Sequence, residues 1–308
     1  MKNVGIISWL CSGDEVLRYL TEKYLLGQKV KQRNKGYIQC YFDLFDENTS
    51  EWGGGIYSPL WTSSHYTLLE LKYMEADYTH CYYQLGAQKV LDGLWFNKGK
   101  VSTSRYQDTC VSAMLVSILV YGRFDDTRIN EIVDYLLAHQ MTDGGWNCAW
   151  DSTTRKSKRS SFNTTICVLE CFADYQKYGY DYRLKEIKNV IQRGQAYLLS
   201  RHLMYSLNTH KLAHPEFDQF FYPPRYKYDS FRALEYFVDS AISYDNRMYE
   251  ALALITDQLD DGRIRTGKKH GGKTHFRLEK TKFGRFNTYR ALKILKAYDY
   301  ERFKRIVH

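Results

Sequence analysis

Apolar residues recur along the chain with the spacing of α-helices, and alternating strand patterns are scarce and short. In residues 128–140 the apolar side chains form one helical stripe, at Ile129, Ile132, Val133, Leu136 and Leu137. Further apolar-periodic runs predict helices that open at Thr62, Asp108, Asn163, Asp229 and Asn287. Four of these five openings are Asp or Asn, whose side chains can cap a helix N-terminus. The pattern predicts an all-α protein.

The predicted helices follow one another as a repeat. Each copy has an apolar helical run, a glycine with a large apolar residue, a polar loop, and a capping residue that opens the next helix. The glycine motifs lie at residues 52–56, 92–95, 143–146 and 261–264, and a weaker copy has Tyr222-Pro223-Pro224 in its loop. This self-similarity indicates stacked helical hairpins over residues 61–300, after a less regular part at 1–60. With 4 prolines and no long Gly/Ser tract to mark a linker, we expect residues 1–308 to form a single domain.

Short motifs at the helix ends resemble the QW repeat of triterpene cyclases. The most complete copy is Tyr135-Leu136, Gln140, Gly144 and Trp146. Partial copies are Gln88, Gly93 and Trp95, then Arg193-Gly194 with Tyr197-Leu198, and finally Gln258, Gly262 and Ile264. They cover roughly residues 86–298 in register with the hairpins. The chain therefore resembles the terpenoid cyclase/protein prenyltransferase (squalene cyclase-like) α/α-toroid superfamily.

The resemblance implies a toroid in which an inner and an outer ring of helices surround a central pocket. The helices that open at Thr62, Asp108, Asn163, Asp229 and Asn287 would form the inner ring. We interpret the motif residues Gln88, Trp95, Gln140 and Trp146 as structural, because a Gln at a helix end and a nearby Trp can tie adjacent repeats together.

The charge is unevenly distributed. The chain has 44 Lys and Arg against 35 Asp and Glu, a formal net charge of +9. The loops before inner helices, at 97–105, 152–162, 223–228 and 262–286, together carry +17, so the remaining residues carry −8. In a toroid these loops share one rim with the inner-helix N-termini, whose free N–H groups favour anions. The sequence predicts an anion-binding mouth there, with Arg105, Arg159, Arg225 and Arg285 as the binding residues.

The predicted mouth suits an isoprenoid diphosphate, whose tail would lie among the pocket's aromatic side chains. The resemblance thus implies a prenyltransferase- or terpenoid-cyclase-like enzyme, a transferase or a cyclase. The reaction itself is not specified, since the chain contains neither an Asp-x-Asp-Asp nor an Asp-Asp-x-x-Asp motif. The alternative is a non-catalytic scaffold whose basic rim binds nucleic acid or an acidic protein, although no nucleic-acid-binding motif is present.

A zinc site is a further candidate by resemblance. Protein prenyltransferases take Asp-x-Cys and His ligands from inner-helix starts, and here Asp108-Thr109-Cys110 and His65 occupy two such starts. We predict Asp108, Cys110 and His65 as catalytic and metal-binding residues. In that family the His follows the Asp-x-Cys in sequence, whereas here it precedes it. Each residue also has a structural explanation: Asp108 as a helix cap, Cys110 as a core thiol and His65 as a polar residue of the funnel. A second histidine cluster, His202, His210 and His214 with Glu216 and Asp218, is the other metal candidate.

The cellular setting follows from what the sequence lacks. It contains no signal-peptide pattern and no apolar run long enough to span a membrane, and its 7 cysteines show no paired spacing. We therefore expect a cytoplasmic protein with reduced thiols, and we read Cys167 and Cys171 as buried small hydrophobes. By analogy with protein prenyltransferases, a second subunit is conceivable.

Overall fold

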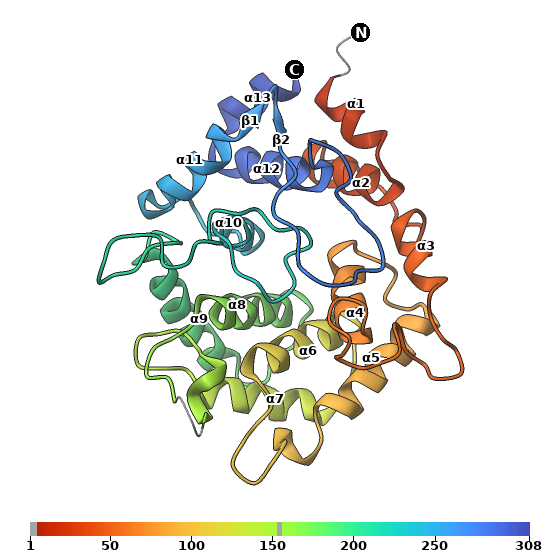
Figure 1. The fold of residues 1–308 in the computed structure, drawn as a ribbon, viewed down its shortest axis with the longest axis vertical. Helices are drawn as coiled ribbons and strands as arrows, with labels where there is room; N and C mark the ends of the chain where they lie inside the picture. Colours follow the sequence, from red (N-terminus) through yellow and green to blue (C-terminus); the bar gives the residue numbers. More distant parts are fainter. Residues whose placement is uncertain (1–4, 153–155) are drawn as a thin grey trace.

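The computed structural model describes residues 5–152 and 156–308, which form an α/α toroid (Figure 1). The inner ring consists of α2 (Glu15–Leu20), α4 (Ser64–Tyr73), α6 (Thr109–Tyr121), α8 (Phe162–Lys177), α10 (Ser230–Asp239) and α12 (Arg285–Tyr298). The outer ring consists of α1 (Ile6–Cys11), α3 (Tyr37–Phe42), α5 (Cys81–Leu94), α7 (Thr127–Ala138), α9 (Leu184–Leu199), α11 (Tyr249–Asp257) and α13 (Tyr300–Val307). The all-α toroid expected from the sequence is thus confirmed.

Short elements complete the chain. The π-helical turn η1 (Thr21–Leu25) follows α2, and the 3-10 turns are η2 (Asn97–Gly99), η3 (Cys148–Asp151) and η4 (Asn246–Met248). Two two-residue strands, β1 (Leu259–Asp260) and β2 (Arg263–Ile264), pair antiparallel. The ring closes where α12 packs against α2 and η1, and the Lys296 ammonium donates to the carbonyls of Tyr24 and Leu25.

The burial of each helix agrees with its place in the ring. From Val111 to Tyr121 every residue of α6 is buried, as expected for an inner helix that is apolar on all sides. The outer helix α7 buries one stripe instead, with Ile129, Ile132 and Leu136 inside. None of the helices in the described part is long and apolar enough to cross a membrane.

The helix starts differ in detail from the expected ones. Asp229 caps α10 as expected, because its side chain accepts the Arg232 N–H at 2.7 Å. Asn163 and Asn287 instead lie inside the first turns of α8 and α12. Their side chains bind a crossing loop: Asn163 accepts the Tyr228 N–H at 2.6 Å, and Asn287 donates to the Phe220 carbonyl at 3.1 Å. Their amides therefore fix long-range contacts.

The QW residues join neighbouring repeats. Trp146 is fully buried, and its indole N–H donates to the Leu136 carbonyl at 2.8 Å. Gln140 donates to the Val190 carbonyl on α9 at 2.8 Å. A side chain at Gly194 of α9 would lie 3.1 Å from the Trp146 ring, so glycine permits the close approach. The same arrangement recurs two repeats earlier, where Trp52 lies against Gly86 of α5.

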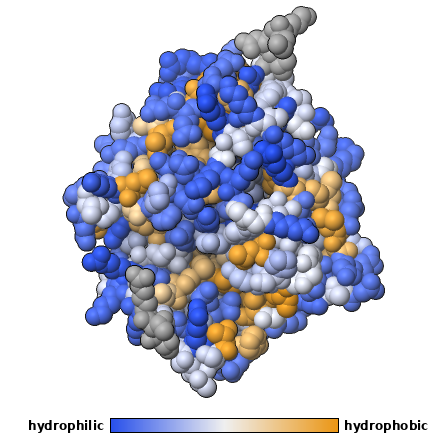
Figure 2. All heavy atoms as spheres, in the orientation of Figure 1, coloured by the Kyte–Doolittle hydropathy of each residue, from blue (hydrophilic) through white to orange (hydrophobic). Residues whose placement is uncertain are grey.

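Two long loops close one end of the ring. The segments 200–229 and 265–284 cross its middle in Figure 1, and atoms fill the middle of this face in the space-filling view (Figure 2). The Trp61 indole donates to the Gly271 carbonyl at 2.5 Å, and the Nε2 atoms of His270 and His275 lie 2.7 and 2.8 Å from the carbonyl oxygens of Pro223 and Thr62. We call this the closed end; it is the end at which α4, α8, α10 and α12 begin.

A buried ion pair anchors the first loop inside the ring. Arg225 Nε and Nη2 lie 2.8 and 2.7 Å from Glu70 Oε1 on α4, and the two side chains are only 2% and 3% exposed. The Arg225 guanidinium also lies 4.6 Å from the centre of the Trp61 ring, while Tyr41 donates to the other Glu70 oxygen. Removing one member of such a pair would leave an uncompensated charge in the protein interior.

We expect Arg225→Met to lower the free energy of unfolding by about 3–5 kcal/mol, because Glu70 would remain buried without its cation. Urea denaturation followed by circular dichroism measures the change. Adding Glu70→Gln to Arg225→Met should recover part of the loss. The exposed control Arg105→Ala should change stability by less than about 0.5 kcal/mol. A loss in Arg225→Met no larger than in this control would contradict the role of the pair.

Candidate functional site

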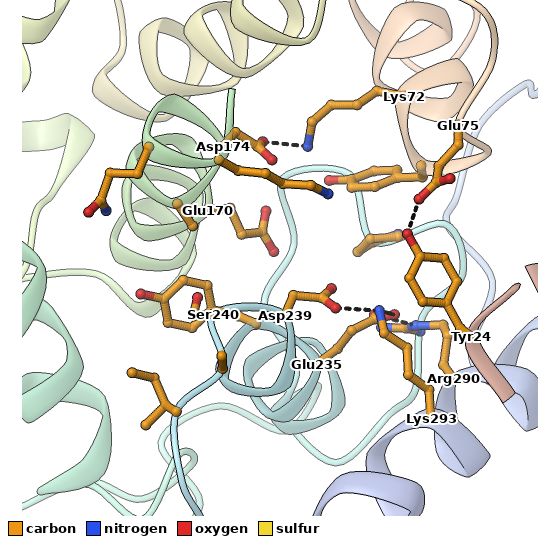
Figure 3. Close-up of a pocket in the computed structure, with 18 of the residues that line it drawn as sticks. Tyr24, Lys72, Glu75, Glu170, Asp174, Glu235, Asp239, Ser240, Arg290 and Lys293 are labelled. Carbon is orange, nitrogen blue, oxygen red and sulfur yellow. Dashed lines mark hydrogen bonds and ion pairs between the residues drawn. The ribbon is translucent and has the colours of Figure 1, made fainter. Parts of the chain in front are cut away.

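A cavity of about 940 Å³ opens at the other end of the toroid, where the inner helices finish. Its wall comes from the last turns of α4, α8 and α10, from α12, and from one face of the outer helix α9. Five carboxylates line it: Glu75, Glu170, Asp174, Glu235 and Asp239. Figure 3 shows Glu170 and Asp174 on one side of the space and Glu235 and Asp239 on the other.

Helical spacing explains how these carboxylates come together. Glu170 and Asp174 are four residues apart on α8, and Glu235 and Asp239 are four residues apart on α10, so each pair lies on one face of its helix. Asp174 and Asp239 lie in last turns, where the helix dipole disfavours negative charge. The wall therefore needs cations close to its carboxylates.

Ion pairs between inner helices supply those cations. Lys72 of α4 lies 2.5 Å from Asp174 of α8, although α6 separates these two helices in the ring. Arg232 of α10, whose side chain is 1% exposed, binds both oxygens of Glu170 on the preceding inner helix α8 at 2.8 and 2.7 Å. Each contact therefore joins two inner helices while neutralising a carboxylate of the cavity.

The contact between α10 and α12 is made by two cations. Arg290 lies 2.7 Å from Glu235, and Lys293 lies 2.5 Å from Asp239 and 3.6 Å from Glu235. Burial acts to raise the pKa of Glu235, but the charges of Arg290 and Lys293 outweigh it and lower that pKa. Glu235 is thus held as a carboxylate.

For Asp239, burial has a larger effect on the pKa than the neighbouring cation does. Burial raises the pKa of its carboxyl, and the charge of Lys293 offsets only part of the effect. Its side chain is still 53% exposed, because the cavity itself opens onto it. Glu235 and Asp239 lie one turn apart, yet their environments push their pKa values in opposite directions. Such a separation is typical of carboxyl groups with different roles in acid–base chemistry.

Tyrosines and a further anion complete the wall. Burial raises the pKa values of Tyr73 and Tyr289 well above the usual range, so both hydroxyls stay protonated and able to donate. Glu75, just after α4, is bound by Lys23, Tyr24 and Tyr19. Burial favours its neutral form, but these hydrogen bonds dominate and lower its pKa. Glu75 therefore connects the cavity to the N-terminal helices.

The four arginines predicted to bind an anion do not converge. Arg225 is buried on Glu70, and Arg105 is exposed beside Asp108, 3.3 Å away. Arg285 donates to the carbonyl of Trp9, with its guanidinium 4.6 Å from the Trp9 ring centre. Arg159 is exposed, and Arg155, counted in the same basic loop, lies outside the described residues. Two of the four basic loops, 223–228 and 262–286, belong to the crossing segments, which fill the space where the mouth was expected.

The three predicted zinc ligands have different partners in the structure. His65 is fully buried at the start of α4, and neither of its ring nitrogens has a hydrogen-bond partner among the described residues. Asp108 pairs with Arg105, and the Cys110 thiol lies against that of Cys148. In the described ranges no group of three or more His, Cys, Asp or Glu side chains is placed to hold a metal ion. The zinc site stays a prediction.

The second histidine cluster is also dispersed. His202 Nδ1 lies 2.9 Å from Glu250 of α11, and the His214 ring accepts the backbone N–H of Glu216. Glu216 is bound by Lys227 and Lys268, whose hydrogen bonds lower its pKa to about 2. These side chains fasten the crossing segment 200–229.

The carboxylate wall was missed from the sequence, although a signal was present. Helices expected to lie in the inner ring carry charged residues at helical spacing beyond their first turns: Glu170 and Asp174, Glu235 and Asp239, Arg290 and Lys293. Charged side chains on the inner surface of a ring of helices must be paired with one another or with a ligand. That pattern marks the cavity end of the toroid.

Comparison with known proteins shows similarity in structure and not in sequence. No protein-family model matches the chain, and no curated protein matches it in sequence. Among solved structures, the chain is similar to a glycosyl hydrolase family 88 protein from Bacteroides vulgatus. The TM-score is 0.47 with 13% sequence identity, over 98% of this chain and 93% of that chain. The likeness concerns the fold.

The expected prenyltransferase- or terpenoid-cyclase-like function is corrected by these findings. The solved structure reported above is named as a glycosyl hydrolase and not as an isoprenoid enzyme. The physical reason lies in the site. An isoprenoid diphosphate needs an open cationic mouth above an apolar pocket, whereas here the basic end is closed and the open cavity is lined by paired charges. The toroid resemblance holds, and the isoprenoid chemistry taken from it does not.

The closed end also contains a carboxyl group with an unusual pKa. Glu279 of the crossing segment is 8% exposed and accepts the backbone N–H groups of Arg285 and Asn287 at 2.8 and 2.9 Å, which caps α12. Burial raises its pKa to about 7, although these hydrogen bonds and Arg290 act in the other direction. The folded protein therefore binds a proton at Glu279 more tightly than the unfolded chain does.

This shift predicts a pH-dependent stability. The contribution of Glu279 is fully present below its unfolded pKa near 4.5 and is lost as the pH rises to about 7, by up to about 3 kcal/mol. Glu279→Gln cannot titrate, so the fall in unfolding free energy between pH 4.5 and 7 should become shallower. Urea denaturation across this range measures it, with the exposed Glu301→Gln as control. Equal slopes in Glu279→Gln and the parent protein would refute the assignment.

Proposed function

We propose that this chain is an enzyme that cleaves a bond in a hydroxyl-rich, carbohydrate-like substrate within the cavity, with Asp239 as proton donor and Glu170 as the facing carboxylate. Glycosidic bonds are commonly cleaved by two carboxyl groups that flank the bond, one protonating the leaving oxygen and the other activating water or stabilising positive charge. The observation that carries the proposal is the placement of these two groups on adjacent inner helices, with both side chains directed into one cavity (Figure 3).

The environments of the two carboxyl groups support different roles. Asp239 has a raised pKa and an open side of its carboxyl group, since its ion pair with Lys293 uses Oδ1. Glu170 is gripped at both oxygens by the buried Arg232, so its position is fixed. A proton donor needs accessibility and a raised pKa, and a charge-stabilising carboxylate needs a rigid position. The two side chains meet these needs respectively.

The remaining wall is suited to sugar hydroxyl groups. The volume of about 940 Å³ lies at the upper end of ordinary ligand sites. Gln192 and Gln195 of α9 and the tyrosines Tyr73 and Tyr289 bring amide and hydroxyl groups to the wall. Aromatic side chains beside hydrogen-bonding groups suit a sugar ring, which is apolar on its faces and carries hydroxyl groups at its edge. The wall runs from Leu20 to Lys293, so we treat residues 1–308 as one functional domain.

We expect Asp239→Asn to lower kcat/KM by about 100-fold or more, because general-acid catalysis contributes about 10²–10⁴-fold. Hydrolysis of a panel of 4-nitrophenyl glycosides and oligosaccharides first identifies the substrate. Asp257→Asn is the matched control, since Asp257 is also the last residue of its helix but is exposed on the outer ring. Its activity should equal that of the parent protein, and all variants should melt at similar temperatures.

Lys293→Met tests the assignment through the pH profile. Lys293 lowers the pKa of Asp239, so its removal should move the alkaline limb of kcat/KM to higher pH. A panel in which no sugar is cleaved and none raises the melting temperature would refute the proposed function. Full activity in both Asp239→Asn and Glu170→Gln would refute the assigned residues.

A further inference from the structure

Two cysteines far apart in the sequence meet at the closed end. Cys110 lies in the first turn of the inner helix α6, and Cys148 begins η3 in the loop before α8. Their sulfur atoms are 3.1 Å apart although the residues are 38 positions apart. As residues, Cys110 and Cys148 are intermediate in exposure, whereas Cys167 and Cys171 are buried within α8. The fold thus brings two thiols together across neighbouring repeats.

The surroundings of the pair distinguish the two sulfur atoms. Cys148 Sγ accepts the backbone N–H of Cys110 at 3.3 Å and lies 3.4 Å from the hydroxyl of Thr164. The two sulfur atoms also share a hydrogen bond, in which the Cys148 thiol donates to Cys110 Sγ; when Cys148 ionises, the Cys110 thiol can donate in the opposite direction. Donors that converge on one sulfur at a helix N-terminus favour its thiolate form, which is the nucleophile in thiol chemistry. Cys148 is therefore the attacking sulfur and Cys110 the resolving one.

We propose that Cys110 and Cys148 form a dithiol site that undergoes thiol–disulfide exchange with a low-molecular-weight disulfide. The Cys148 thiolate attacks one sulfur of that disulfide and releases the other as a thiolate, leaving a mixed disulfide on Cys148. Cys110 then loses its proton to the released thiolate and attacks Cys148 Sγ, and the second small thiol leaves. The two cysteines together lose two electrons, and the small disulfide gains them as two thiols.

The site is separate from the cavity. It lies at the start of α6, whereas the cavity wall contains no residue of α6 and uses the far ends of the neighbouring helices. The bond would connect α6 to the segment before α8, which is already held by Asn147, whose side chain donates to Ser157 and to the Arg159 carbonyl. Exchange at this dithiol would therefore alter the closed end without depending on the proposed carbohydrate chemistry.

Oxidised glutathione is the probe. The full-length protein, reduced and freed of reductant, is incubated with defined mixtures of oxidised and reduced glutathione, and free thiols are then blocked. Tryptic peptides should show one cross-link joining the Cys110 and Cys148 peptides, and the intact mass should fall by about 2 Da. Because the cross-link closes a long loop, the melting temperature should rise by roughly 5 °C in the oxidised protein and not in the reduced one.

Single variants separate this site from general thiol oxidation. Cys148→Ser and Cys110→Ser should abolish the cross-link, and Cys110→Ser should accumulate the glutathione adduct on Cys148. Cys40→Ser and Cys81→Ser, which replace exposed thiols, are the controls and should cross-link like the parent protein. A glutathione adduct that persists in the parent protein, a cross-link to another cysteine, or no oxidation at all would overturn the proposal. Each of these results is independent of whether any sugar is cleaved.

Discussion

Charged side chains inside the ring are stabilised by partners on other inner helices, and the open end of the toroid depends on these pairs. Arg232 with Glu170 and Arg290 with Glu235 join consecutive inner helices, while Lys72 with Asp174 joins α4 to α8, which α6 separates in the ring. A buried charge without a partner costs far more than a paired one returns. The pairs therefore restrict how the inner helices are arranged as well as how the cavity is charged. They also leave one carboxyl group, that of Asp239, less completely compensated than the rest.

Buried charges are also paired at the closed end, but there the pair fixes a loop instead of joining two helices. Arg225 is carried into the ring by a loop and meets Glu70 beside Tyr41 and Trp61, so the pair holds the loop in place. The Glu279 carboxylate is bound instead by backbone N–H groups, those of Arg285 and Asn287. One end of the ring is thus closed by its own loops, while the other keeps its charges at the surface of a cavity. The asymmetry follows from loop length, because the long connections all precede inner helices.

Much of the architecture could be predicted from the sequence, because it depends on local patterns. The all-apolar α6 and the striped α7 were recognisable as inner and outer helices, and Asp229 was a true cap. The location of the site was not predictable in the same way. The +17 charge of the loops before the inner helices predicted an open anion-binding mouth, which requires these loops to stay outside the ring. Their course depends instead on long-range contacts, such as that of Arg225 with Glu70. Asn163 and Asn287 show the same limit, since each resembled a cap but binds a crossing loop.

The inner helices span both ends of the toroid. In α8, Thr164 of the first turn lies 3.4 Å from Cys148 Sγ, and Asp174 of the last turn lies on the cavity wall. Glu170 lies on the same helix and is bound by Arg232 of α10, whose first turn is capped by the buried Asp229. The two proposed reacting carboxyl groups are therefore carried by α8 and α10, and the starts of both helices are bound at the closed end. Because Asn163 near the start of α8 accepts the Tyr228 N–H, and Asp229 accepts the Phe221 N–H, the crossing segment 200–229 makes contacts with both helices.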